Sequence, residues 1–178
     1  MTLVTVPNLL SVSRVILIPA LAGALLQHVG WLSIMLFGVV VVSDILDGYV
    51  ARKTRQASIW GARLDHGSDA IFVTAITGVF AYLGLLPVLL PCVIAVAFLQ
   101  YSVDSTFTGN PGLRSSKIGR WNGIAYFVIT GLAIFVHVFV THLAIRELLA
   151  TLGMVLVVTT MISIIARVLY FLKATRES

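Results

Sequence analysis

Charged residues and cysteine are both scarce in this 178-residue sequence. Only 11% of the residues are charged while 59% are hydrophobic, and the mean hydropathy is +1.04. Soluble globular domains carry about 25% charged residues, so this composition indicates a protein embedded in a membrane. The one cysteine, Cys92, excludes a disulfide or a cysteine-based metal site within one chain. Because Cys92 follows Pro91 in an apolar segment, we expect a small buried side chain there.

Acidic residues are scarce too, and they are unevenly placed. Four of the seven lie between Asp44 and Asp69, inside an otherwise apolar part of the chain. Ionised carboxylates close to hydrocarbon are costly unless they are paired. This aspartate cluster therefore predicts that the protein holds something cationic.

Six apolar stretches are each long enough to cross a membrane, which takes about 20 residues. The connections between them are short and contain no linker or low-complexity segment. We therefore predict an all-α integral membrane protein in which residues 1–178 form a single domain, a bundle of six transmembrane helices. The stretches cover approximately residues 9–28, 31–52, 62–84, 86–106, 118–140 and 147–171.

The basic residues predict the orientation of these helices. If both termini are cytosolic, eleven of the twelve Lys and Arg residues fall at or near the cytosolic side, and Arg146 falls outside. The positive-inside rule then predicts a multi-pass protein of the cell (inner) membrane with the aspartate cluster facing the cytosol. The same rule explains the net charge of +5 without nucleic acid, because the basic residues form no stripe with interleaved aromatics. A cleavable signal peptide is disfavoured because five more apolar stretches follow the first.

The spacing of the aspartates predicts a metal site. Asp44 and Asp47 are three residues apart, Asp65 and Asp69 are four apart, and on a helix with about 3.6 residues per turn each pair projects from one face. If the two faces meet, two divalent cations would balance the formal charge of −4 on the four carboxylates. Ligation by oxygen alone favours Mg²⁺ or Mn²⁺, and two such ions suit phosphoryl transfer.

Small and basic residues accompany the aspartates. Gly48 and Gly61 allow helices or a ligand to approach closely, and Ala51 lies one turn beyond Asp47. Arg52 adds a positive charge suited to a phosphate or to orienting a carboxylate. Capping or snorkelling would explain any one charged residue at a helix end, but the full set at fixed spacing indicates a functional site.

Taken together, these residues resemble the complete signature of the CDP-alcohol phosphatidyltransferase family. The pattern is Asp44-x-x-Asp47-Gly48-x-x-Ala51-Arg52, eight residues, then Gly61-x-x-x-Asp65-x-x-x-Asp69. The chain length and the six stretches also resemble the family throughout. In addition, Pro7, Asn8 and Arg14 resemble the start of the first helix in the branch that makes phosphatidylglycerophosphate, which places Asn8 and Arg14 on the substrate side.

The resemblance implies that an acceptor alcohol displaces CMP from CDP-diacylglycerol, and it implies a homodimer. A carboxylate within hydrogen-bond reach can take the proton of the acceptor hydroxyl as attack proceeds. By resemblance the metal ligands are Asp44, Asp47 and Asp65, with Asp69 contributing to the metal site and acting as the general base. The residues expected to line the nucleotide site are Gly48, Ala51, Arg52 and Gly61.

The signature does not determine the acceptor, so residues outside it must. Three basic residues lie three positions apart at the start of the fifth stretch, namely Arg114, Lys117 and Arg120. Together they predict a pocket for an acceptor phosphate. This favours glycerol 3-phosphate over phosphatidylglycerol (which gives cardiolipin), inositol phosphate or serine; membrane anchoring is the alternative explanation for the three cations. His66 departs from the glycerol-phosphate branch, which usually carries proline there, and we expect its side chain to face a neighbouring helix or the membrane interface because it diverges from Asp65.

A cation or proton transporter is the alternative of a different class, since carboxylates inside membranes also build ion pathways. That function predicts acids spread through the membrane depth or matched in two repeats. Here they gather at one end, and the last four stretches add only Asp104 and Glu147. The distribution therefore favours the enzyme.

Overall fold

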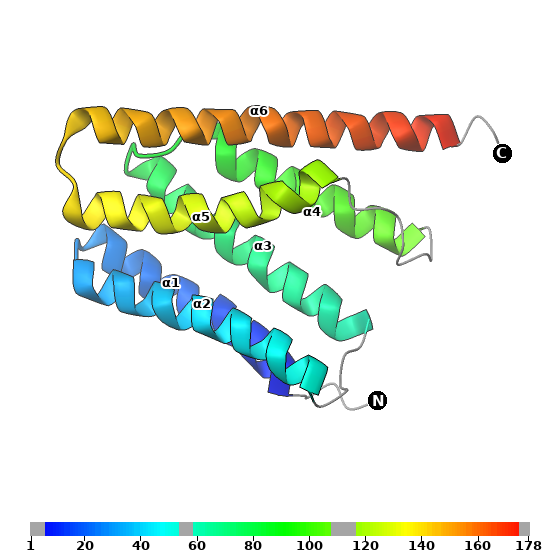
Figure 1. The fold of residues 1–178 in the computed structure, drawn as a ribbon, viewed down its shortest axis with the longest axis horizontal. Coiled ribbons are helices and arrows are strands. Elements are labelled where there is room, and N and C mark those ends of the chain that lie inside the picture. Colours follow the sequence, from blue (N-terminus) through cyan, green and yellow to red (C-terminus); the bar gives the residue numbers. More distant parts are fainter. Residues whose placement is uncertain (1–5, 54–58, 108–116, 175–178) are drawn as a thin grey trace.

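The computed structural model describes residues 6–53, 59–107 and 117–174, and within these ranges it consists of six α-helices without a strand (Figure 1). This confirms the all-α class, and each predicted apolar stretch overlaps one helix. The helices are α1 (Val6–Leu26), α2 (Gly30–Lys53), α3 (Ile59–Tyr82), α4 (Leu89–Phe107), α5 (Lys117–Phe139) and α6 (Leu143–Ala174).

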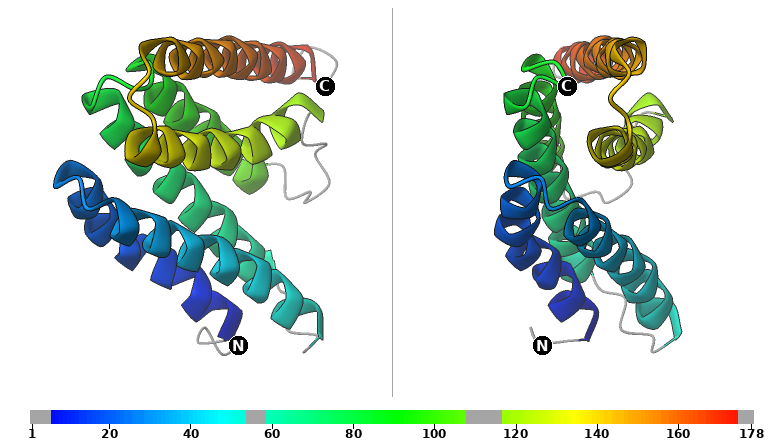
Figure 2. Two further views of the ribbon diagram at one scale, coloured as in Figure 1. Left: turned by 60° about the vertical axis from the view of Figure 1, so that its left-hand side comes forward. Right: turned by 90° about the vertical axis from the view of Figure 1, so that its left-hand side faces the viewer.

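Successive helices run in opposite directions, so their ends gather at two ends of the bundle. The turns that join α1 to α2, α3 to α4 and α5 to α6 lie at one end, which we call the turn end (Figures 1 and 2). The start of α1 and the end of α6 lie at the other, which we call the site end. Helix α3 is central, since it packs on α1, α4 and α5, while α6 covers α4 and α5.

Two of the helices stop with the same backbone arrangement. His28 (φ 57°) follows α1 and Gly84 (φ 71°) follows α3, each in the left-handed region. In both cases the next amide donates to a carbonyl five residues back, Val29 to Ala24 (2.8 Å) and Leu85 to Phe80 (2.9 Å). This is the Schellman arrangement, which satisfies the last carbonyls of a helix and reverses the chain.

The core of the bundle is built on α3. Phe72, Ile76 and Phe80 are fully buried, and they lie four residues apart, on one face of the helix. Phe72 stacks between Phe37 of α2 and Phe127 of α5, with ring centroids 6.4 Å and 6.1 Å away. Burying three aromatic rings in contact fixes α3 against its neighbours, which holds the acidic start of α3 in place.

Helices α5 and α6 provide the clearest membrane-crossing segments. Among the described residues, Gly119–Phe139 and Leu143–Tyr170 are long and apolar enough to cross a membrane, and only 33% and 28% of their most apolar windows are buried inside the protein. Apolar surface on this scale needs a non-aqueous environment or a partner. The apolar parts of α1, α2 and α4 are shorter, namely Ser11–Leu26, Gly30–Leu46 and Leu89–Ser102, so six complete spans and cytosolic termini stay predictions.

The expectation for Cys92 is wrong. Its side chain is exposed on α4, where the thiol lies 3.6 Å from the Val88 carbonyl one turn earlier. In a membrane protein an apolar residue on the outside of a helix faces lipid instead of the core, so an apolar sequence environment does not imply burial within the chain.

Candidate active site

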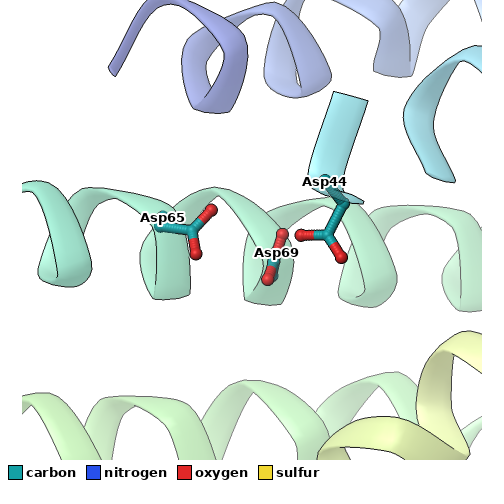
Figure 3. Close-up of side chains that lie close together, drawn as sticks. All are labelled: Asp44, Asp65 and Asp69. Atoms are coloured by element: carbon teal, nitrogen blue, oxygen red, sulfur yellow. The ribbon is translucent and has the colours of Figure 1, made fainter. Parts of the chain in front are cut away.

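Three of the four predicted aspartates converge at the site end of the bundle (Figure 3). Asp44 comes from α2, and Asp65 and Asp69 come from successive turns of α3. One carboxylate oxygen from each lies within 4.8 Å of the others. The predicted meeting of the two acidic faces is therefore present for these three side chains, whereas the side chain of Asp47 lies outside the described residues.

Arg14 of α1 lies against all three carboxylates. Its Nη1 atom is 3.0 Å from Asp44 Oδ1 and also contacts Asp69 Oδ1, and its Nη2 atom is 2.6 Å from Asp65 Oδ1. The Arg14 side chain has 0% exposure, whereas those of Asp44, Asp65 and Asp69 are 42%, 38% and 23% exposed. A buried guanidinium is tolerated because three carboxylates compensate for its lost hydration.

The packing of α1 explains this arrangement. Helix α1 packs on both α2 and α3, so a side chain on the face between them reaches both acidic helices. Ser11 and Arg14 are three residues apart and share that face; the Ser11 hydroxyl donates to Asp65 Oδ1 at 3.3 Å. One polar face of an otherwise apolar helix thus organises the aspartate cluster.

The aspartate cluster also fits a divalent ion. All its donors are oxygens, its carboxylates are partly open to solvent, and the Arg14 contacts fall on the Oδ1 atoms. Each carboxylate has a second oxygen that can serve as a ligand. With Arg14 included, the three described carboxylates have a formal charge of −3 + 1 = −2, which suits a hard divalent cation.

Comparison with known proteins agrees with this geometry. The sequence profile of CDP-alcohol phosphatidyltransferases matches residues 4–165, nearly the whole chain. The chain belongs to the CDP-alcohol phosphatidyltransferase family. This confirms the resemblance drawn from the signature residues.

Relatives within this family carry different names. The chain is 32% identical over 133 residues to CDP-diacylglycerol–glycerol-3-phosphate 3-phosphatidyltransferase of Cereibacter sphaeroides, a match covering 70% of this chain and 60% of that protein. It is 42% identical over 86 residues to a putative cardiolipin synthase of Mycobacterium tuberculosis, covering 47% and 40%. A human cardiolipin synthase (CMP-forming) is 32% identical over 85 residues, covering 47% and 28%. The chain thus spans less than two thirds of the length of each of these relatives.

The remaining signature residues lie near the three aspartates in the fold. Gly48, Ala51 and Arg52 lie in the last turns of α2, where the side chains are outside the described residues, and Gly61 lies in the first turn of α3, partly buried. The helical positions agree with a site at the junction of α2 and α3. The nucleotide-binding roles of these residues stay predictions.

The predicted acceptor residues are placed only in part. Arg120 is exposed near the start of α5, at the site end of the bundle. Lys117 begins α5 and Asn8 lies in the first turn of α1, both without a described side chain, and Arg114 lies outside the described residues. The pocket for an acceptor phosphate therefore stays a prediction.

Beside the aspartate cluster, two contacts with the Tyr101 ring of α4 join this helix to α3 and α6. The ring of His66 lies 5.1 Å from that of Tyr101, and the guanidinium of Arg167 lies 5.3 Å from the centroid of the same Tyr101 ring. This confirms that His66 faces a neighbouring helix. From the sequence, Arg167 is only one of the basic residues near the predicted cytosolic side, because a cation–π partner 66 positions away along the chain gives no periodic signal.

Proposed function

We propose that this protein transfers a phosphatidyl group from CDP-diacylglycerol to an acceptor alcohol and releases CMP. The observation that carries the proposal is that Asp44, Asp65 and Asp69 meet at one end of the helical bundle. The sequence also contains every residue of the family signature. Carboxylates gathered at one site, with a signature for CDP-alcohols around them, suit phosphoryl chemistry better than an ion pathway.

In the proposed reaction the acceptor hydroxyl oxygen attacks the phosphorus that carries the diacylglycerol. A new P–O bond forms, the P–O bond to the CMP phosphate breaks, and CMP leaves with the electron pair of that bond. Asp69 takes the hydroxyl proton as the attack proceeds, because an unaided alkoxide is inaccessible near neutral pH. Among the three described carboxylates Asp69 is the least exposed, at 23%, which keeps bulk water from competing with the acceptor. No covalent enzyme intermediate is required.

The metal cofactor is part of this proposal. Asp44, Asp47, Asp65 and Asp69 would hold two Mg²⁺ or Mn²⁺ ions, which supply charge neutralisation for the diphosphate and the departing CMP. Gly48, Ala51 and Gly61 leave room for the cytidine. Arg52 holds the diphosphate or orients an aspartate.

Glycerol 3-phosphate is the proposed acceptor, which makes the product phosphatidylglycerophosphate. The cations for its phosphate come from Arg114, Lys117 and Arg120, and a relative that is 32% identical over 133 residues is named for this acceptor. Phosphatidylglycerol, which gives cardiolipin, is the second candidate, because several relatives are named cardiolipin synthases. The active site faces the cytosol of a bacterial-type inner membrane, and the protein works as a homodimer.

The deciding experiment follows CMP release from CDP-diacylglycerol by the purified protein with Mg²⁺ or Mn²⁺. Glycerol 3-phosphate, phosphatidylglycerol, inositol phosphate and serine are supplied one at a time. We expect CMP release that depends on an acceptor and is fastest with glycerol 3-phosphate. Faster release with phosphatidylglycerol would transfer the assignment to cardiolipin synthesis, and no release with any acceptor, together with ion flux in vesicles, would favour the transporter.

A further inference from the structure

Arg14 is a fully buried cation whose contacts are spread over the three described members of the aspartate cluster. Two of its nitrogens reach the Oδ1 atoms of Asp44, Asp65 and Asp69, and Ser11 on the same face of α1 supports one of those oxygens. A cation that only anchored α1 in the membrane would extend to the surface. This one points inward and ends among the proposed metal ligands.

Charge explains what such a residue does. Without Arg14, the three described carboxylates would face one another with a formal charge of −3, and with it the sum is −2. Like charges at this separation repel, so the ion-free site needs a counter-charge. Once divalent ions are bound, the same counter-charge opposes them.

We propose that Arg14 is the built-in counter-ion of the aspartate cluster, a positioning residue that holds the three carboxylates together in the ion-free protein and weakens their binding of divalent ions. This rests on the proposed function only in requiring that the cluster binds such ions. Arg14 acts through the aspartates, and no contact with substrate is needed.

The direction of the effect on affinity follows from the packing. The helices that carry Asp44, Asp65 and Asp69 both pack on α1, so the spacing of these residues does not depend on Arg14 alone. Loss of its charge therefore changes the attraction for a cation more than it changes the geometry. A unit charge within about 4–6 Å alters charge-dependent equilibria by roughly tenfold or more.

The test measures thermal unfolding of the full chain in detergent, in EDTA and across a Mn²⁺ titration, without substrates. For Arg14→Gln we expect an unfolding midpoint in EDTA at least about 5 °C below that of the wild type, because a buried ion pair loses one partner. We expect half-maximal stabilisation at roughly tenfold less Mn²⁺. Arg14→Lys, which keeps the charge, should lie much closer to the wild type in its Mn²⁺ requirement.

Arg146→Gln is the matched control, since it removes the same charge from the start of α6, at the turn end of the bundle. Its Mn²⁺ requirement should equal that of the wild type. The inference is wrong if Arg14→Gln needs as much Mn²⁺ as the wild type, or more, for half-maximal stabilisation. It is also wrong if no folded Arg14→Gln protein can be purified in either EDTA or Mn²⁺, because Arg14 is then a plain structural residue. If Mn²⁺ fails to stabilise even the wild type, the proposed metal site itself is wrong.

Discussion

Asp44, Asp65 and Asp69 are chemically the same residue, but their surroundings differ. Asp44 and Asp65 are 42% and 38% exposed, whereas Asp69 is 23% exposed and lies one turn deeper along α3 than Asp65. A general base has to reach the reacting hydroxyl while excluding competing water, and a metal ligand can tolerate more solvent. This difference in exposure is the reason for proposing different roles within the aspartate cluster.

Replacement of Asp69 by Asn tests this division. The amide keeps the shape of the side chain but accepts no proton from the acceptor, so we expect CMP release to fall by at least about 100-fold. Glu147→Gln is the matched control, because Glu147 is exposed at the start of α6 and should retain full activity. Unchanged activity in Asp69→Asn contradicts the assignment of the base.

A second residue-level prediction concerns the acceptor. Lys117→Ala and Arg120→Ala remove cations at the start of α5, and each should raise the KM for glycerol 3-phosphate by roughly 5- to 30-fold with a smaller effect on kcat, because a charged hydrogen bond to the phosphate is lost. Initial rates at saturating CDP-diacylglycerol measure both constants. An unchanged KM in both variants would return these residues to membrane anchoring.

At this scale the sequence predicted the aspartates well and Arg14 poorly. The spacing of the acids within α2 and α3 follows from the helical period alone, so which residues share a face could be worked out. The contact of Arg14 with all three carboxylates depends on how α1 packs against two other helices. Periodicity within one helix carries no information about that packing.

At the scale of elements, helix α3 positions two of the three described carboxylates of the site. Its start holds Asp65 and Asp69, its middle is locked between aromatic rings of α2 and α5, and its end is closed at Gly84. The positions of the helices were predicted to within a few residues from apolar length. Their exact ends were not, because backbone capping decides them, as at His28, which adopts the left-handed conformation that glycine most often takes at a helix end.

Gly84 allows a clean test of the end of α3. A Cβ added there meets nothing within 4 Å, so the cost of Gly84→Ala comes from the positive φ alone, about 1 kcal/mol in the free energy of unfolding. The matched control is Gly78→Ala, inside α3 one turn before its last residue, which also has open space. It should be neutral or stabilise by up to about 1 kcal/mol, since alanine is the better helix former. Equal effects in denaturation of the two variants would exclude the backbone explanation.

At the scale of the whole molecule, the alternating direction of the helices gives the bundle two ends with different contents. The turn end holds three tight connections, while the site end holds the aspartate cluster and the start of α5 (Figure 1). Composition predicted the membrane class and the number of helices. Which end faces the cytosol rests on the distribution of basic residues, because that choice depends on insertion into the membrane and not on internal packing.

Cysteine labelling tests the orientation. In a Cys92→Ser background, Thr141→Cys lies in the exposed turn between α5 and α6, and Ser58→Cys lies between α2 and α3, outside the described residues. With the site end in the cytosol, a membrane-impermeant maleimide should label Thr141→Cys in intact cells and Ser58→Cys only after permeabilisation. The reverse pattern would place the site outside the cytosol and deny it cytosolic nucleotide.

The pairing of Arg14 with Asp44 also matters while the chain is being made. These two residues belong to α1 and α2, which leave the ribosome before α3, and their side chains lie 3.0 Å apart. A charged residue entering a bilayer alone is expensive, but these two can neutralise each other before α3 exists. The hairpin of α1 and α2 can therefore be inserted with Arg14 and Asp44 already paired, and Asp65 and Asp69 join this pair only when α3 docks.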